Sequence, residues 1–146
     1  MKNPTEDNFV VEYTWQELYL LTKHWKSDIQ FYKDDIKFLQ RLINKYFIWV
    51  TKKENIEKVT KIESSLHRLT KKCDSLINSI DKHLEQLSNL INDPFKYDTQ
   101  RFKTEHPKLE NDIAEFIKIF REHKKETFAI TEYIVDDEKL MRHLES

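Results

Sequence analysis

The feature that most constrains this chain is the absence of glycine from its 146 residues. Two-residue β-hairpin turns need backbone angles that glycine adopts most readily. The loops that cradle phosphates in P-loop and dinucleotide-binding folds are also built on glycines. The sequence therefore argues against a sheet protein, a P-loop enzyme and a Rossmann fold. The chain is long enough to form a hydrophobic core, because a chain of about 150 residues buries roughly 68–70% of its unfolded surface.

Two helix starts can be read from capping-box spacing, in which a Thr and a Glu three residues later bond each other's backbone N–H groups. Thr14 and Glu17 have this spacing, and so have Thr51 and Glu54. The second pair predicts a new helix soon after the first, so that 51–53 would be a tight turn between antiparallel neighbours. The alternative is a continuous helix through this junction, which would give an extended, domain-swapped dimer.

Apolar residues recur at three- and four-residue spacings in the stretches 14–50, 52–91 and 107–144, which predicts an amphipathic helix in each. The middle stretch has the most regular heptad. One of its seam positions holds Val59, Leu66, Cys73, Ile80 and Leu87, and the other holds Ile62, Leu69, Leu76, His83 and Leu90. We therefore expect an all-α fold, an up-down-up bundle of three long antiparallel helices with coiled-coil-like packing.

The segment 92–106 connects the second and third predicted helices. Pro94 disfavours helix in the residue before it, and Pro107 suits the first helical position, where its missing N–H costs nothing. We expect residues 1–13 to be partly disordered and 14–146 to form one helical-bundle domain. The aromatic residues of the connection are expected to cover the open end of the core: Phe95, Tyr97 and Phe102.

Cysteine usage and hydropathy favour a cytoplasmic protein. The single cysteine, Cys73, cannot form a disulfide within the chain, and its seam position predicts an inert, buried thiol. The first residues lack the basic and apolar order of a secretion signal. The longest apolar run, 46–50, is far shorter than the ~20 residues that span a membrane. We expect no membrane partner.

Four polar residues are candidate ligands for a metal or a small molecule. His24 and Asp28 are one turn apart on the first helix, and His83 and His123 occupy seam positions on the other two. Helical bundles build metal sites from such inward-facing side chains. However, the sequence has neither the Glu-x-x-His motif of carboxylate-bridged di-iron bundles, nor an HExxH motif, nor paired cysteines. We expect no catalytic residue, no metal and no cofactor, and keep a metal or ligand site as the alternative.

The favoured interpretation of these polar residues is structural. A buried Asp28–His123 pair would fix the register of the helices at some cost in stability. Asp35, one heptad after Asp28, is expected to pair with a lysine across the groove between two helices. The acidic run 135–138 lacks the spacing of a calcium loop, and we expect it to face solvent.

The first and third helices carry more apolar residues than a three-helix core needs. Large exposed aromatic surfaces are rarely left bare on a monomer, and aromatic residues are enriched at the centres of interfaces. The alternative is that the N-terminal segment and residues 95–102 cover these side chains. The predicted interface consists of Leu20, Phe31, Phe38, Trp49, Ile117, Phe128 and Val135.

Charge is distributed unevenly along the chain. Residues 18–53 hold eight Lys or Arg against three Asp, whereas residues 108–146 hold seven basic against ten acidic residues. A basic stripe on the first helix could follow a phosphate backbone. However, the net charge is −1, and that side of the helix offers no aromatic residue to stack on bases, so nucleic acid is an unlikely partner. The stripe consists of Lys23, Lys26, Lys33, Lys37, Arg41 and Lys45.

Together these features predict a non-enzymatic protein–protein interaction module that forms a homodimer through the aromatic flanks of its first and third helices. Another helical protein could occupy the same surface. A bundle that binds metal or a small ligand is the first alternative, and a nucleic-acid-associated protein is the second.

Overall fold

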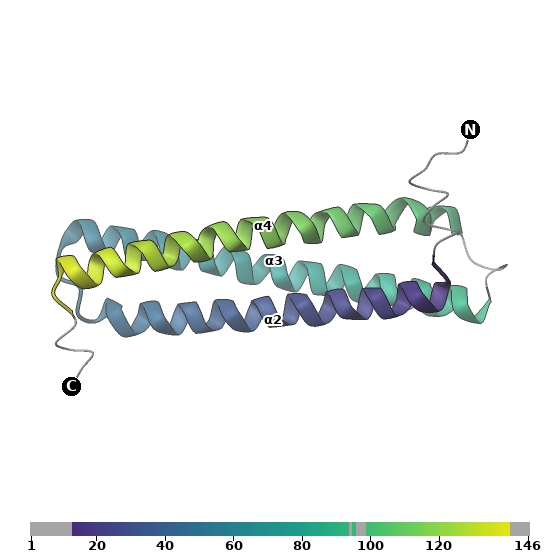
Figure 1. Ribbon diagram of the computed structural model, residues 1–146, viewed down its shortest axis with the longest axis horizontal. Helices are drawn as coiled ribbons and strands as arrows, with labels where there is room; N and C mark the ends of the chain where they lie inside the picture. Colours follow the sequence, from purple (N-terminus) through teal and green to yellow (C-terminus); the bar gives the residue numbers. More distant parts are fainter. Residues whose placement is uncertain (1–12, 94, 96–98, 141–146) are drawn as a thin grey trace. The chain divides into compact units, whose positions relative to one another are not determined.

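Three long helices make up the fold. The structure is a computed structural model that describes residues 13–93, 95 and 99–140. In these residues the elements are α2 (Trp15–Phe47), α3 (Lys53–Asn92) and α4 (Thr99–Asp137), and none of them is a strand (Figure 1). The predicted all-α three-helix bundle is confirmed. Partial disorder was predicted for residues 1–13, and of these only Tyr13 belongs to the described residues.

The helices are divided between two compact units. The first unit contains Met1–Phe31 and Asp74–Glu115, and the second contains Tyr32–Cys73 and Phe116–Ser146. Each unit therefore takes one section of α2, one of α3 and one of α4. Within each unit the section of α3 runs antiparallel to those of α2 and α4, and the latter two run in the same direction. The single domain expected over 14–146 stays a prediction.

The boundary between α2 and α3 is a turn. The helix α2 begins with the predicted capping box: the N–H of Thr14 donates to Oε1 of Glu17 at 3.3 Å, and the N–H of Glu17 donates to Oγ1 of Thr14 at 3.1 Å. At its other end α2 stops at Phe47, and α3 starts only at Lys53. The hairpin is thus confirmed, and the continuous helix is wrong.

The heptad of α3 is buried along its whole length. Leu66, Cys73, Ile80 and Leu87 have no exposed surface, and His83 is buried with them. The remaining seam residues are also buried: Val59, Ile62, Leu69, Leu76 and Leu90. Cys73 is a buried thiol outside any disulfide, as its seam position predicted.

The helix α4 begins eight residues earlier than predicted. It starts at Thr99, so Pro107 lies inside the helix and not at its first position. A proline there removes a backbone hydrogen bond and crowds the carbonyl of Lys103, four residues earlier. Continuing the helix brings Phe102 and His106, one turn apart, into the interior, where they are 1% and 2% exposed. We attribute the early start to this burial, which offsets the cost of the proline.

Near the start of α4, the core of the first unit is built around Phe102. It packs with Leu18 of α2 and with Leu87 and Leu90 of α3, and Trp15 meets its ring edge-on at 5.3 Å between centroids. Phe102 therefore joins the core as expected. The expectation is wrong for Phe95, which is 98% exposed, and Tyr97 lies outside the described residues.

In the second unit α2 and α4 lie side by side. Tyr32 contacts the rings of Phe116 and Phe120, with centroids 6.3 and 5.0 Å away. Three residues later, Asp35 accepts a 2.8 Å hydrogen bond from Nζ of Lys124. The lysine partner predicted for Asp35 is thus confirmed. Because residue numbers rise together in these pairs, the two helices run in the same direction.

A carboxylate from the end of α4 caps α3. The Glu138 side chain accepts hydrogen bonds from the N–H and the hydroxyl of Thr51, the N–H of Lys52 at 2.9 Å and the amide of Asn55 at 3.0 Å. The first N–H groups of a helix lack partners within the helix and favour a negative charge. The partner of Thr51 is therefore Glu138 and not Glu54, so the second predicted capping box is wrong.

The neighbouring Asp137 strengthens this contact. Its carboxylate accepts from the amide of Asn55 at 2.8 Å and pairs with Nζ of Lys52 at 3.0 Å. Beyond it the chain turns at Lys139, which has a φ of 54°, and the N–H of Leu140 donates to the carbonyl of Val135. The expectation that the run 135–138 faces solvent holds for Asp136, which is exposed, but not for Val135, which is buried. Asp137 and Glu138 are partly exposed and bind the start of α3.

Removal of this capping charge is expected to destabilise the fold above pH 4.5. Hydrogen bonds from Asn55, Lys52 and Thr51 lower the pKa of Glu138 from 4.5 to about 2. A carboxylate with a lowered pKa stabilises the folded state above its unfolded pKa, and the stabilisation is lost as the pH falls through the window from 4.5 to about 2. We expect Glu138→Gln to lower the melting temperature at pH 7 and to flatten the pH dependence in this window.

The control for this prediction is Glu122→Gln, which removes an exposed acid from α4. Thermal melting followed by circular dichroism at pH 7, 4 and 3 checks both variants. Equal melting temperatures for Glu138→Gln and the control at pH 7 would contradict the capping role of Glu138.

Candidate functional site

The four candidate ligands do not gather in one place. His24 pairs with Asp28 on the surface of α2, with Nε2 and Oδ2 3.6 Å apart and side chains 71% and 44% exposed. The buried Asp28–His123 pair is therefore wrong. His123 is half-buried in the second unit, where it lines a cleft of about 250 Å³ between α3 and α4. Across the described residues, no three or more His, Cys, Asp or Glu side chains are grouped so that they could hold a metal ion.

The remaining candidate, His83, is bonded to a second buried histidine. Its Nε2 lies 2.7 Å from Nδ1 of His106, so one ring donates to the other. The rings of both residues are stacked: His83 on Phe102 at 4.4 Å and His106 on Trp25 at 4.8 Å. This arrangement joins all three helices of the first unit. It uses the facing nitrogen of each ring within the pair, which leaves neither of these two atoms for a metal.

Burial keeps both histidines neutral. It lowers the pKa of His83 from 6.5 to about 4, although the nearby charge of Glu105 raises that pKa. It lowers the pKa of His106 to about 3, with His83 contributing in the same direction. A neutral imidazole offers one donor and one acceptor, which is the combination that a His–His hydrogen bond requires.

A shallow polar cleft opens beside the pair. It has a volume of about 260 Å³ between α3 and α4, and His83 forms part of its wall. Glu105 is held there by Nε of Arg101 at 2.9 Å and by Nε2 of Gln86 at 3.1 Å. The charged groups around the cleft thus include an internal ion pair. The other lining residues are Ser79, Lys82, Lys108, Leu109 and Asp112.

Sequence reasoning missed His106 because it was assigned to the connection before Pro107. The signal was present in the apolar spacing. Phe102 and His106 continue the three- and four-residue alternation of α4 backwards from Leu109 and Ile113. Allowing the helix to run through the proline would have placed both residues on its inner side.

Most of the predicted interface residues are exposed. Leu20 and Phe31 of the first unit are each 67% exposed. In the second unit Phe38 is 53%, Trp49 40% and Phe128 42% exposed. Ile117 is half-buried. Val135 is only 7% exposed because it faces the core, and it does not belong to an exposed surface.

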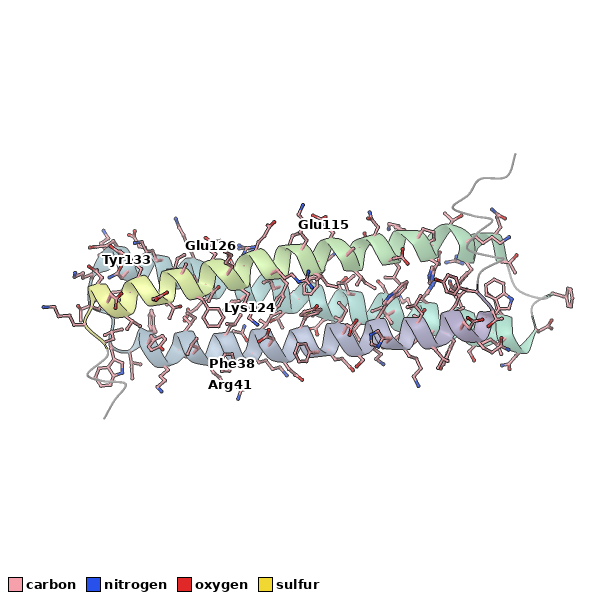
Figure 2. All side chains as sticks on the ribbon, in the orientation of Figure 1. Phe38, Arg41, Glu115, Lys124, Glu126 and Tyr133 are labelled. Atoms are coloured by element: carbon pink, nitrogen blue, oxygen red, sulfur yellow. The ribbon has the colours of Figure 1, made fainter. Side chains whose placement is uncertain are left out.

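Two of the exposed residues of the predicted interface, Phe38 and Phe128, lie on the same side of the second unit. Phe38 comes three residues after Asp35, and Phe128 comes four residues after its partner Lys124. Since a helix turns once in 3.6 residues, both aromatic rings lie one turn beyond the ion pair, on the same side of α2 and α4. Figure 2 shows Lys124 between the two helices and Phe38 on the outside of α2.

We call this surface the aromatic face, and define it as Phe38, Leu42, Ile117 and Phe128. Leu42 follows Phe38 by four residues and is half-buried. The segments that could have covered the predicted interface do not do so where they are described, since Phe102 lies in the core of the first unit and Phe95 is exposed. The aromatic face is therefore an exposed apolar surface on two parallel helices.

The basic stripe of α2 is partly engaged inside the bundle. Lys26 pairs with Asp81 of α3, with Nζ and Oδ1 2.7 Å apart, so it does not project away from the other helices as predicted. Lys23 lies 5.9 Å from the centre of the Tyr19 ring.

No protein-family model, curated protein or solved structure matches this chain. Along the described parts of the chain, no helix has a stretch long and apolar enough to cross a membrane.

Proposed function

We propose that this protein is a non-enzymatic interaction module that self-associates through the aromatic face of its second unit. The observation that carries the proposal is the exposure of Phe38 and Phe128, 53% and 42%, on neighbouring helices. Full burial of a phenylalanine side chain contributes about 1.5–3 kcal/mol. Two copies would bury four such rings, each already about half buried, so the face supplies apolar surface that favours association.

The composition of the face supports this proposal over a catalytic role. Its residues are apolar and carry no group that could act as an acid, a base or a nucleophile. Aromatic residues at the centre with charged residues at the rim are typical of protein–protein interfaces. Arg41 and Lys45 follow Phe38 on α2, and Glu132 follows Phe128 on α4, so the face has such a rim.

A negative charge on the aromatic face is expected to dissociate the dimer. We expect the unaltered protein to sediment as a dimer and both Phe38→Glu and Phe128→Glu to sediment as monomers, because dimerisation would bury the new carboxylate without a partner. Sedimentation velocity over a range of protein concentrations measures the change.

The matched control is Phe95→Glu, which makes the same substitution at a 98% exposed residue of the first unit. It is expected to remain dimeric, and circular dichroism should show the same helix content in all variants. A monomeric unaltered protein, or a dimer that survives both substitutions on the face, would overturn the proposed function.

A further inference from the structure

The charged residues beside the aromatic face are sorted by sign. From Ile36 to the end of α2 the charged residues are Lys37, Arg41 and Lys45, all basic. On α4 the charged residues from Glu126 to Asp137 are all acidic: Glu126, Glu132, Asp136 and Asp137. Because Asp35 pairs with Lys124, these two sections lie at the same height in the second unit.

Part of each section borders the aromatic face. Arg41 and Lys45 come about one and two turns after Phe38, and Glu132 and Asp136 come one and two turns after Phe128. At 3.6 residues per turn, Arg41 lies on the side of Phe38 away from α4, and Asp136 lies on the side of Phe128 away from α2. The face thus has a basic rim on α2 and an acidic rim on α4. Figure 2 shows Arg41 beside Phe38 on the outside of α2.

Two copies can bring their aromatic faces together around a two-fold axis in two ways. With the axis along the helices, α2 of each copy packs against α4 of the other copy, and all four helices run in the same direction. With the axis across the helices, α2 packs against α2 and α4 against α4, in antiparallel pairs. The distribution of charge distinguishes these arrangements.

We propose that two copies associate in the parallel arrangement, in which α2 of each chain packs against α4 of its partner. The inference rests on the proposed function. In this arrangement Arg41 and Lys45 face the partner's Glu132 and the partner's Asp136, and the same contacts are repeated on the other side of the two-fold axis. An antiparallel dimer centred on these sections opposes bases with bases and acids with acids, and such like-charge contacts suppress a mode of association.

An exchange of the two rims tests the arrangement. The first variant, Arg41→Glu with Lys45→Glu, makes both rims acidic, and the second, Glu132→Lys with Asp136→Lys, makes both rims basic. We expect each to raise the dimer dissociation constant by at least about tenfold, which corresponds to 1.4 kcal/mol. A third variant carries all four changes, so that an acidic rim again faces a basic rim, and we expect its dissociation constant to return to within about threefold of the original.

Sedimentation equilibrium at low salt measures the three constants, since screening weakens exposed charge contacts at high salt. Dissociation constants of the first two variants that stay within about threefold of the original or decrease, or a third variant that remains weakened, would overturn the parallel arrangement. These results would leave the proposed function intact, provided that the unaltered protein is a dimer that Phe38→Glu dissociates. If the unaltered protein is a monomer, both proposals fail.

A narrower exchange covers the case in which four substitutions unfold the chain. Lys45→Glu and Asp136→Lys, alone and together, change one position on each rim. The pair is expected to restore the dimer that each single change weakens. Circular dichroism confirms that each variant keeps its helix content, and a pair that is weaker than both single variants contradicts the parallel arrangement.

Discussion

Acidification is expected to weaken the fold from pH 6.5 downwards, a decline that begins above the range in which most carboxylates titrate. The cause is the buried pair of His83 and His106, whose pKa values are lowered to about 4 and about 3. Below pH 6.5 the unfolded chain binds protons that the folded chain excludes, so the free energy of unfolding falls with the pH. Each histidine contributes a slope of about 1.4 kcal/mol per pH unit.

This slope ends where the folded histidines themselves take up protons. It is therefore expected to decrease below about pH 4 for His83 and below about pH 3 for His106. The window from pH 6.5 to pH 5 separates the effect from that of Glu138, whose stabilisation is lost only from pH 4.5 downwards. Urea unfolding at pH 7, 6 and 5 measures the slope.

Two double variants test whether the buried histidine pair causes the fall of the unfolding free energy between pH 7 and pH 5. The double change His83→Leu with His106→Leu removes both titrating rings and leaves apolar side chains of similar size, so the unfolding free energy should become nearly constant from pH 7 to pH 5. The control, His24→Gln with His67→Gln, removes two exposed histidines and should keep the original slope. A slope that persists in the leucine variant would show that other groups cause it.

The second large effect is expected from Phe102→Ala, which should lower the free energy of unfolding by about 3–5 kcal/mol. Phe102 is 1% exposed, packs with Leu87 and Leu90 and stacks on His83. Truncation to alanine leaves a cavity that its neighbours fill only in part. The substitution also opens His83 to water, so we expect a reduced slope between pH 6.5 and pH 5 in the same variant.

The chain offers a matched control for this substitution. Phe95 lies seven residues before Phe102 but is 98% exposed, and changes at such surface positions usually alter stability by less than about 0.5 kcal/mol. Urea unfolding of Phe95→Ala and Phe102→Ala at pH 7 compares the two. Equal stabilities would mean that residues 99–106 do not dock on the core, and that the third helix begins at Pro107 as its sequence suggests.

The parts of the fold that were predictable depend on residues close to each other in the chain. The capping box of Thr14 and Glu17 and the heptad of α3 involve spacings of three and four residues, and both are found in the structure. Asp35 was predictable in a weaker sense. Its position at the edge of the seam indicated a lysine partner, and the structure identifies that partner as Lys124.

The errors occur where a distant contact outweighs a local preference. A proline favours the start of a helix, but the burial of Phe102 and His106 extends α4 through Pro107. A Thr three residues before a Glu favours a capping box, but Thr51 donates its hydrogen bonds to Glu138 and not to Glu54. Val135 fits an exposed flank on a helical wheel, but it is only 7% exposed in the structure.

The sequence by itself determined that there are three long helices, most of the buried positions on each one and the exclusion of glycine-dependent folds, because helical periodicity is set by neighbours within one turn. Only the tertiary structure decided which residues meet. His83 and His106 are 23 residues apart, and Thr51 and Glu138 are 87 apart. Such pairs depend on the axial register of the helices, which is fixed by the sum of the packing contacts along them, so no local pattern specifies it.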